Sequence, residues 1–71
     1  MLTYQSPIGT WSISNRSGKY YLFFDSTCYG VYHSAVAAAD DVYCFATGCS
    51  EWDILAGTIE PPQDPSEWEN D

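Results

Sequence analysis

The stretch that decides the fold spans residues 8–47 and reads IGTWSISNRSGKYYLFFDSTCYGVYHSAVAAADDVYCFAT. Alternating apolar and polar residues predict strands over residues 8–14, 19–25 and 28–33, and turn-forming residues separate them. Successive strands joined by short turns pair in antiparallel fashion. The sequence therefore predicts a three-stranded antiparallel sheet over residues 8–33.

The second predicted strand is apolar on both faces. Leu22 and its neighbours two positions away lie on one face, whereas Tyr21 and Phe23 lie on the other. A face that carries such rings is either covered by another part of the chain or left open as a binding surface. We expect the C-terminal segment to cover Tyr21 and Phe23, and we keep a dimer or partner surface as the alternative.

An alanine-rich helix is expected to follow the sheet. Ser34 is a favourable N-cap, Gly48 suits the residue just after a helix, and the predicted helix covers residues 35–47. At 100° per residue, one side collects the apolar residues, and Asp40 and Asp41 fall opposite. The expected inward residues are Val36, Ala39, Val42, Tyr43 and Ala46.

Residues 49–71 form an acidic C-terminal segment that contains three prolines. Ser50 is expected to start a short helical turn that points Trp52 inward, and the prolines favour an extended chain beyond it. Together the segments predict one α+β domain over residues 1–71. In this prediction the three-stranded sheet packs on one helix, and the acidic segment completes the core.

Charge is the strongest functional signal in the sequence. Ten Asp and Glu stand against two Lys and Arg, which gives a formal net charge of −8 on 71 residues. A field of this sign repels nucleic acid and anionic membranes and attracts basic protein surfaces. Two acid-Trp-acid triplets, at residues 51–53 and 67–69, predict that buried indoles fix the flanking carboxylates in place.

No catalytic, cofactor or metal signature is found. A nucleophile–base pair would need His33, the only histidine, beside Cys28, Cys44 or Cys49. Cysteine is more often a small core residue, and an odd number of cysteines without a secretion signal favours reduced thiols. We expect a non-enzymatic protein without cofactor in the cytoplasm of a bacterial host, and a thiol-dependent enzyme is the weakest alternative.

Two resemblances bear on function. Gly30, Tyr32, Ser34, Ala38 and Ala39 give residues 9–47 an order of strands and helix that resembles plant AP2-type and integrase-arm DNA-binding domains. The arginines with which such sheets grip DNA are missing, so the resemblance implies the topology and not DNA binding. In size, acidity and aromatic content the chain resembles phage-encoded anti-CRISPR and other DNA-mimic inhibitors.

The second resemblance implies that the protein inhibits a CRISPR effector subunit by covering a basic DNA-recognition surface, as a monomer or weak dimer. In the alternative, it is a phage or mobile-element assembly module that binds through aromatic residues, and the acids only keep it soluble. The candidate aromatic contacts are Tyr21, Phe23 and Trp68. The candidate acidic contacts are Asp40, Asp41, Glu51, Asp53, Glu60, Asp64, Glu67 and Glu69.

Overall fold

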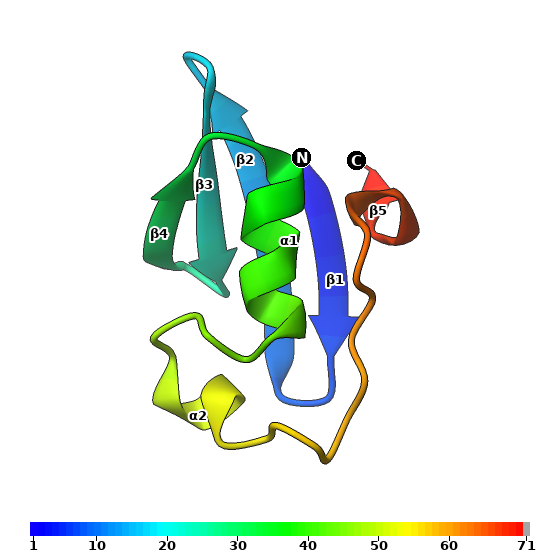
Figure 1. Cartoon of the computed structure of the whole chain (residues 1–71). Helices are drawn as coiled ribbons and strands as arrows, with labels where there is room; N and C mark the ends of the chain where they lie inside the picture. The colour runs from blue at the N-terminus through cyan, green and yellow to red at the C-terminus, as the bar shows by residue number, and fades with distance from the viewer. Residues whose placement is uncertain (71) are drawn as a thin grey trace.

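The computed structural model describes residues 1–70 and contains one antiparallel sheet of five strands (Figure 1). The strands are β1 (Leu2–Ser6), β2 (Gly9–Arg16), β3 (Lys19–Phe24), β4 (Thr27–Tyr32) and β5 (Glu69–Asn70), in the spatial order β4-β3-β2-β1-β5. The helices are α1 (Ala35–Tyr43), the short α2 (Ser50–Asp53) and the single 3-10 turn η1 (Pro65–Glu67).

The prediction of a three-stranded sheet was wrong because two strands were missed. β2, β3 and β4 lie where the three strands were expected, but β1 pairs with β2 through the register Tyr4↔Trp11. Leu2 and Tyr4 alternate with polar residues, and the turn that follows includes Pro7. That alternation was the available signal, and it was overlooked because the strand is only five residues long.

The second missed strand, β5, comes from the last described residues. Its two residues pair with Leu2 and Thr3 of β1, so the C-terminal segment closes the sheet edge and does not cross the sheet face. The expected position of this segment over Tyr21 and Phe23 was therefore wrong. The physical reason is that Trp68 is buried on the helix side, where its ring lies 5.7 Å from that of Tyr4.

Helix α1 begins as predicted, because the Ser34 side chain accepts a hydrogen bond from the Ala37 N–H at 3.1 Å. The helix ends at Tyr43, four residues before the expected end. Phe45 adopts a positive φ of 56° there, and the Ala46 N–H donates to the Asp41 carbonyl at 2.9 Å. This is the Schellman ending with phenylalanine in the usual glycine position, and Phe45 stacks on Trp52 at 4.9 Å.

The buried side of α1 is also displaced from the predicted one. Ala38, Ala39 and Val42 are fully buried against the sheet, whereas Val36 is 63% exposed. Ala38 and Ala39 let the helix backbone approach the sheet closely, since a methyl group takes little space. The helix is therefore rotated about its own axis relative to the predicted orientation, and Val36 faces solvent.

Trp52 lies at the centre of the core. Its ring contacts those of Tyr4, Trp11 and Phe45, and its indole N–H donates to the Val42 carbonyl at 3.0 Å. The prediction that α2 points this indole inward is confirmed by its complete burial. The core therefore fills the space between α1, α2 and one face of the sheet (Figure 1).

Candidate protein-binding surfaces

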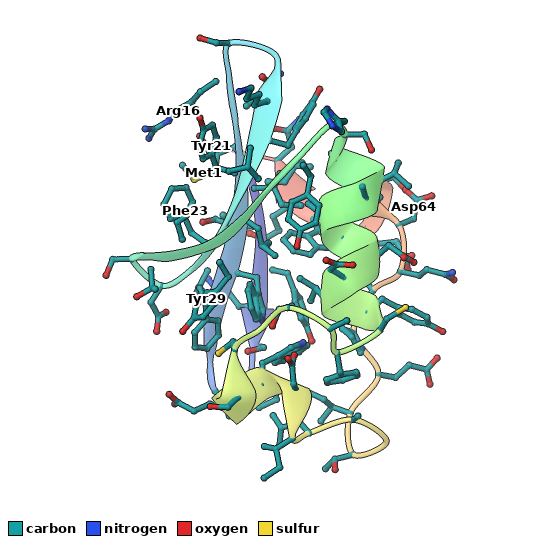
Figure 2. The ribbon with its side chains drawn as sticks, turned by 60° about the vertical axis from the view of Figure 1, so that its left-hand side comes forward. Met1, Arg16, Tyr21, Phe23, Tyr29 and Asp64 are labelled. Carbon is teal, nitrogen blue, oxygen red and sulfur yellow. The ribbon has the colours of Figure 1, made fainter. Side chains whose placement is uncertain are left out.

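Seven of the predicted acidic contacts lie on α1, α2 and the C-terminal segment, and we call this surface the acidic side. Figure 2 shows Asp64 beyond α1, whereas Arg16, Tyr21 and Phe23 lie on the opposite side of the sheet. Glu69 lies apart in β5, opposite Thr3 at the sheet edge. The members of the acidic side are Asp40, Asp41, Glu51, Asp53, Glu60, Asp64 and Glu67.

Asp53 is the carboxylate held most firmly. It accepts hydrogen bonds from the Thr47 N–H at 3.2 Å, the Thr47 hydroxyl at 2.9 Å and the Gly48 N–H at 3.0 Å. These bonds tie the loop after α1 to helix α2. Asp53 is therefore a structural residue whose side chain keeps only part of its acceptor capacity for a partner.

Asp41 accepts a hydrogen bond from the Tyr32 hydroxyl at 2.7 Å, which joins α1 to β4. Burial and this bond to Asp41 raise the pKa of Tyr32 well above its ordinary value. The hydroxyl therefore stays protonated and keeps the Asp41 carboxylate in a fixed position.

Asp64 and Glu67 form a capping box around η1. The Asp64 carboxylate accepts the Ser66 N–H at 2.9 Å, and Glu67 accepts the Asp64 N–H at 3.3 Å. The hydrogen bond from Ser66 lowers the pKa of Asp64. Both acids are exposed but held near the backbone, so the tail carries ordered charge.

The remaining acidic candidates are exposed and less constrained. Asp40 accepts a long contact from the Cys44 thiol at 3.8 Å, and loss of hydration together with this carboxylate raises the pKa of Cys44. Glu51, Glu60 and Glu69 are exposed as well. These four carboxylates keep their acceptor capacity, and we expect their replacement to leave the fold intact.

The sheet face away from α1 is open, and we call Ser12, Ser14, Tyr21, Phe23 and Val31 the open face. The register places Phe23 opposite Ser12, and Tyr21 opposite both Ser14 and Val31. Val31 is 52% exposed, and the two rings are half-buried. The rings lie beside small serines and Met1, and no helix of the described residues covers them (Figure 2).

The two cations belong to the same face. Arg16 pairs with Lys19 at the end of the β2–β3 hairpin, and both are exposed. The turn between them, Ser17-Gly18, has positive φ at both residues, which suits a tight hairpin. Both cations therefore lie on the open face, and seven acids belong to α1, α2 and the C-terminal segment, whereas Asp25 and Glu69 lie outside this set.

Trp68, the third aromatic candidate, is only 5% exposed and packs on Tyr4. Both indoles of the acid-Trp-acid triplets are buried, so their neighbours are anchored to the core. Trp68 itself is not on the surface of the folded domain.

A groove between the end of α1 and the C-terminal segment was not foreseen from the sequence, and we call it the tail groove. It consists of two adjoining cavities of about 510 Å³ and about 490 Å³ that share Tyr43, Glu60 and Pro61. No pattern in the sequence links Tyr43 to Glu60, because the loop after α1 and α2 lie between them. The other lining residues are Phe45, Gly57, Thr58, Ile59, Pro62, Gln63 and Glu67.

The three cysteines are free, and only Cys49 is buried. The exposed thiols of Cys28 and Cys44 contact the Gly30 carbonyl at 3.6 Å and Asp40 at 3.8 Å. Within residues 1–70, no three His, Cys, Asp or Glu side chains come together as metal ligands. The geometry therefore brings no thiol into a hydrogen bond with His33 in this part of the chain.

Comparison of the chain with protein-family models, curated proteins and solved structures finds no match. Among the described residues, no helix has the length and apolar character that crossing a membrane requires. The surfaces of the folded domain are therefore the basis of the proposed function.

Proposed function

We propose that this protein is a non-enzymatic inhibitor whose acidic side binds a basic, DNA-recognising surface of another protein. The partner that we propose is a subunit of a CRISPR effector complex, which the protein would block by competing with DNA. The observation that carries the proposal is the uneven distribution of charge, with seven acids on α1, α2 and the C-terminal segment and both cations on the sheet face away from α1.

The acidic side is suited to such a partner because part of it is fixed before binding. Asp41, Asp53, Asp64 and Glu67 are all held by hydrogen bonds within the domain. Ordered groups lose less conformational entropy on association than flexible ones. Carboxylates also accept paired hydrogen bonds from arginine, as DNA phosphates do.

The test is competition between this protein and a DNA duplex for a purified DNA-binding subunit, at low salt and at 0.5 M salt. Asp40→Lys removes an exposed carboxylate and changes the net charge from −8 to −6, and we expect it to weaken competition about tenfold. The matched control is Gln5→Lys with Val31→Lys, which gives the same net charge from two exposed positions on the sheet face away from α1.

We expect the control to compete almost as well as the unchanged protein, because its new cations lie away from the acidic side. Equal weakening in both variants would mean that only total charge matters. Binding that persists in 0.5 M salt would contradict an electrostatic interface, since exposed charges are strongly screened there.

A second candidate is favoured by the open face, where Tyr21 and Phe23 lack the cover that we expected. In that case the protein is an assembly module, and its aromatic residues bind a second copy or a structural partner. Phe23→Ser with Val31→Ser would then abolish association, whereas Asp40→Lys would not. Sedimentation of both variants separates the two candidates.

A further inference from the structure

The residues that line the tail groove combine aromatic rings, prolines and carboxylates. Tyr43 and Phe45 supply aromatic surface, Pro61 and Pro62 supply rigid apolar surface, and Glu60 lines both cavities. Glu67 adds a second carboxylate at one end. The two cavities are lined by no lysine, arginine or histidine of the described chain.

This chemistry selects a side chain with an apolar stem and a cationic head. The stem packs on proline and phenylalanine, and the head lies near carboxylate and over an aromatic ring. Arginine fits better than lysine because its planar guanidinium stacks on rings and donates in pairs to a carboxylate. The domain cannot supply this group itself, since both of its cations lie on the open face.

We infer that the tail groove is a binding site for an arginine side chain of the partner protein, with Glu60 as its principal carboxylate and Tyr43 as its aromatic wall. This inference rests on the proposed function and locates within the acidic side the position where a single basic residue is recognised.

The groove is ordered before it is occupied. Pro61 is buried, and the segment that contains it is anchored further along by the capping box at η1 and by buried Trp68. On the other side, Tyr43 is the last residue of α1 and is followed by the hydrogen-bonded helix ending. Both walls therefore keep their positions, and binding needs little further ordering.

The experiment is an NMR titration of the full chain, labelled with nitrogen-15, with a capped Gly-Arg-Gly peptide. Peptides with lysine or with citrulline, the uncharged analogue, in place of arginine serve for comparison. We expect amide shifts confined to the lining residues that have an N–H, which are Tyr43, Phe45, Gly57, Thr58, Ile59, Glu60, Gln63 and Glu67. We also expect the arginine peptide to bind about tenfold more tightly than the citrulline peptide, because the loss of one charge-assisted contact typically weakens binding by about this factor.

The matched variants are Glu60→Gln and Glu51→Gln, which remove the same charge from two exposed positions inside and outside the groove. Glu60→Gln should weaken arginine binding to the citrulline level, and Glu51→Gln should leave it unchanged. Tyr43→Leu should remove the preference for arginine over lysine while some binding persists.

Shifts spread over the whole acidic side, equal binding of lysine and arginine, or equal effects of the two glutamine variants would overturn the inference. The failure of the proposed function is distinguishable from this result. If Asp40→Lys loses competition with DNA and Glu60→Gln keeps it, the proposed inhibitor function stands and the proposed arginine site in the tail groove is wrong. If arginine binds at the tail groove but the protein does not compete with DNA, the arginine site stands and the proposed inhibitor function is wrong.

Discussion

Both faces of the sheet carry aromatic rings, more of them towards α1 than on the open face, and the surroundings of the rings differ. Towards α1, Trp11 and Leu22 are fully buried under the helix and under Trp52. On the open face, Tyr21 and Phe23 lie on the same strand as Leu22 but remain half-exposed among serines. Sequence alternation assigns side chains to faces, but which face is covered depends on where distant segments pack.

The largest expected effect comes from neighbouring residues of β3 that point to opposite faces. Leu22→Ala should lower the free energy of unfolding by about 3 kcal/mol, because it leaves a cavity in the core. Phe23→Ala should lower it by about 1 kcal/mol or less. Urea unfolding followed by tryptophan fluorescence measures both, and equal losses would mean that the open face is covered in solution.

The next effect compares two acids of α2. Asp53→Asn removes the charge that accepts three hydrogen bonds and should lower the free energy of unfolding by about 2 kcal/mol. Glu51→Gln, two residues earlier on the exposed surface, should change it by less than about 0.5 kcal/mol. Thermal unfolding of the pair checks this, and an unaffected Asp53→Asn would show that the loop holds without its carboxylate.

A smaller effect concerns Tyr32, whose pKa is raised in the folded state. Below pH 10 both states keep the proton, so stability is unaffected by this group. Above pH 10 the unfolded chain loses the proton first, and stability falls as pH rises. Tyr32→Phe should cost about 1 kcal/mol at pH 7 and should reduce the loss between pH 9 and pH 11.

The measurement for Tyr32 is the urea midpoint at each pH, with Tyr43→Phe as a control. A fall in stability of the same steepness in Tyr32→Phe and in the unchanged protein would assign the alkaline sensitivity to other tyrosines. Tyr4 and Tyr29 also have raised pKa values, so part of the fall should remain.

The smallest effect tests the corrected helix face. Val36→Lys should change the free energy of unfolding by less than about 0.5 kcal/mol, because Val36 is 63% exposed. Val42→Ala, on the buried side, should cost more than this. Thermal unfolding of both separates them, and a large loss in Val36→Lys would restore the face that the sequence pattern favoured.

Local patterns predicted the central part of the fold. The alternation around Trp11 and Leu22 located β2 and β3, Ser34 located the start of α1, and Trp52 was correctly expected inside. The predictions that were wrong concern elements whose positions depend on contacts between distant segments. β5 is too short to have a pattern of its own, and its position follows from the burial of Trp68 beside Tyr4.

The candidate surfaces show the same division. The list of acids could be read from the sequence, but the hydrogen bonds that hold Asp41 and Asp53 could not, because Tyr32 and Thr47 reach these carboxylates only in the folded chain. The capping box of Asp64 and Glu67 is different, since it is a local signature that the sequence does contain. The tail groove was beyond sequence analysis for the same reason as the hydrogen bonds of Asp41 and Asp53. Its walls come from the end of α1 and from a proline segment that has no regular pattern.

The pairing of Leu2 with Asn70 joins the two ends of the described chain and closes the largest loop in the sheet. We expect this contact to form late in folding and to open readily in the folded state. Closing a long loop costs entropy, and only two residue pairs offset that cost. Amide hydrogen exchange should therefore be fastest in β5 and slowest in β2 and β3. Each such opening would also uncover the indole of Trp68, so a protease that cuts only exposed chain would reach this end of the molecule first.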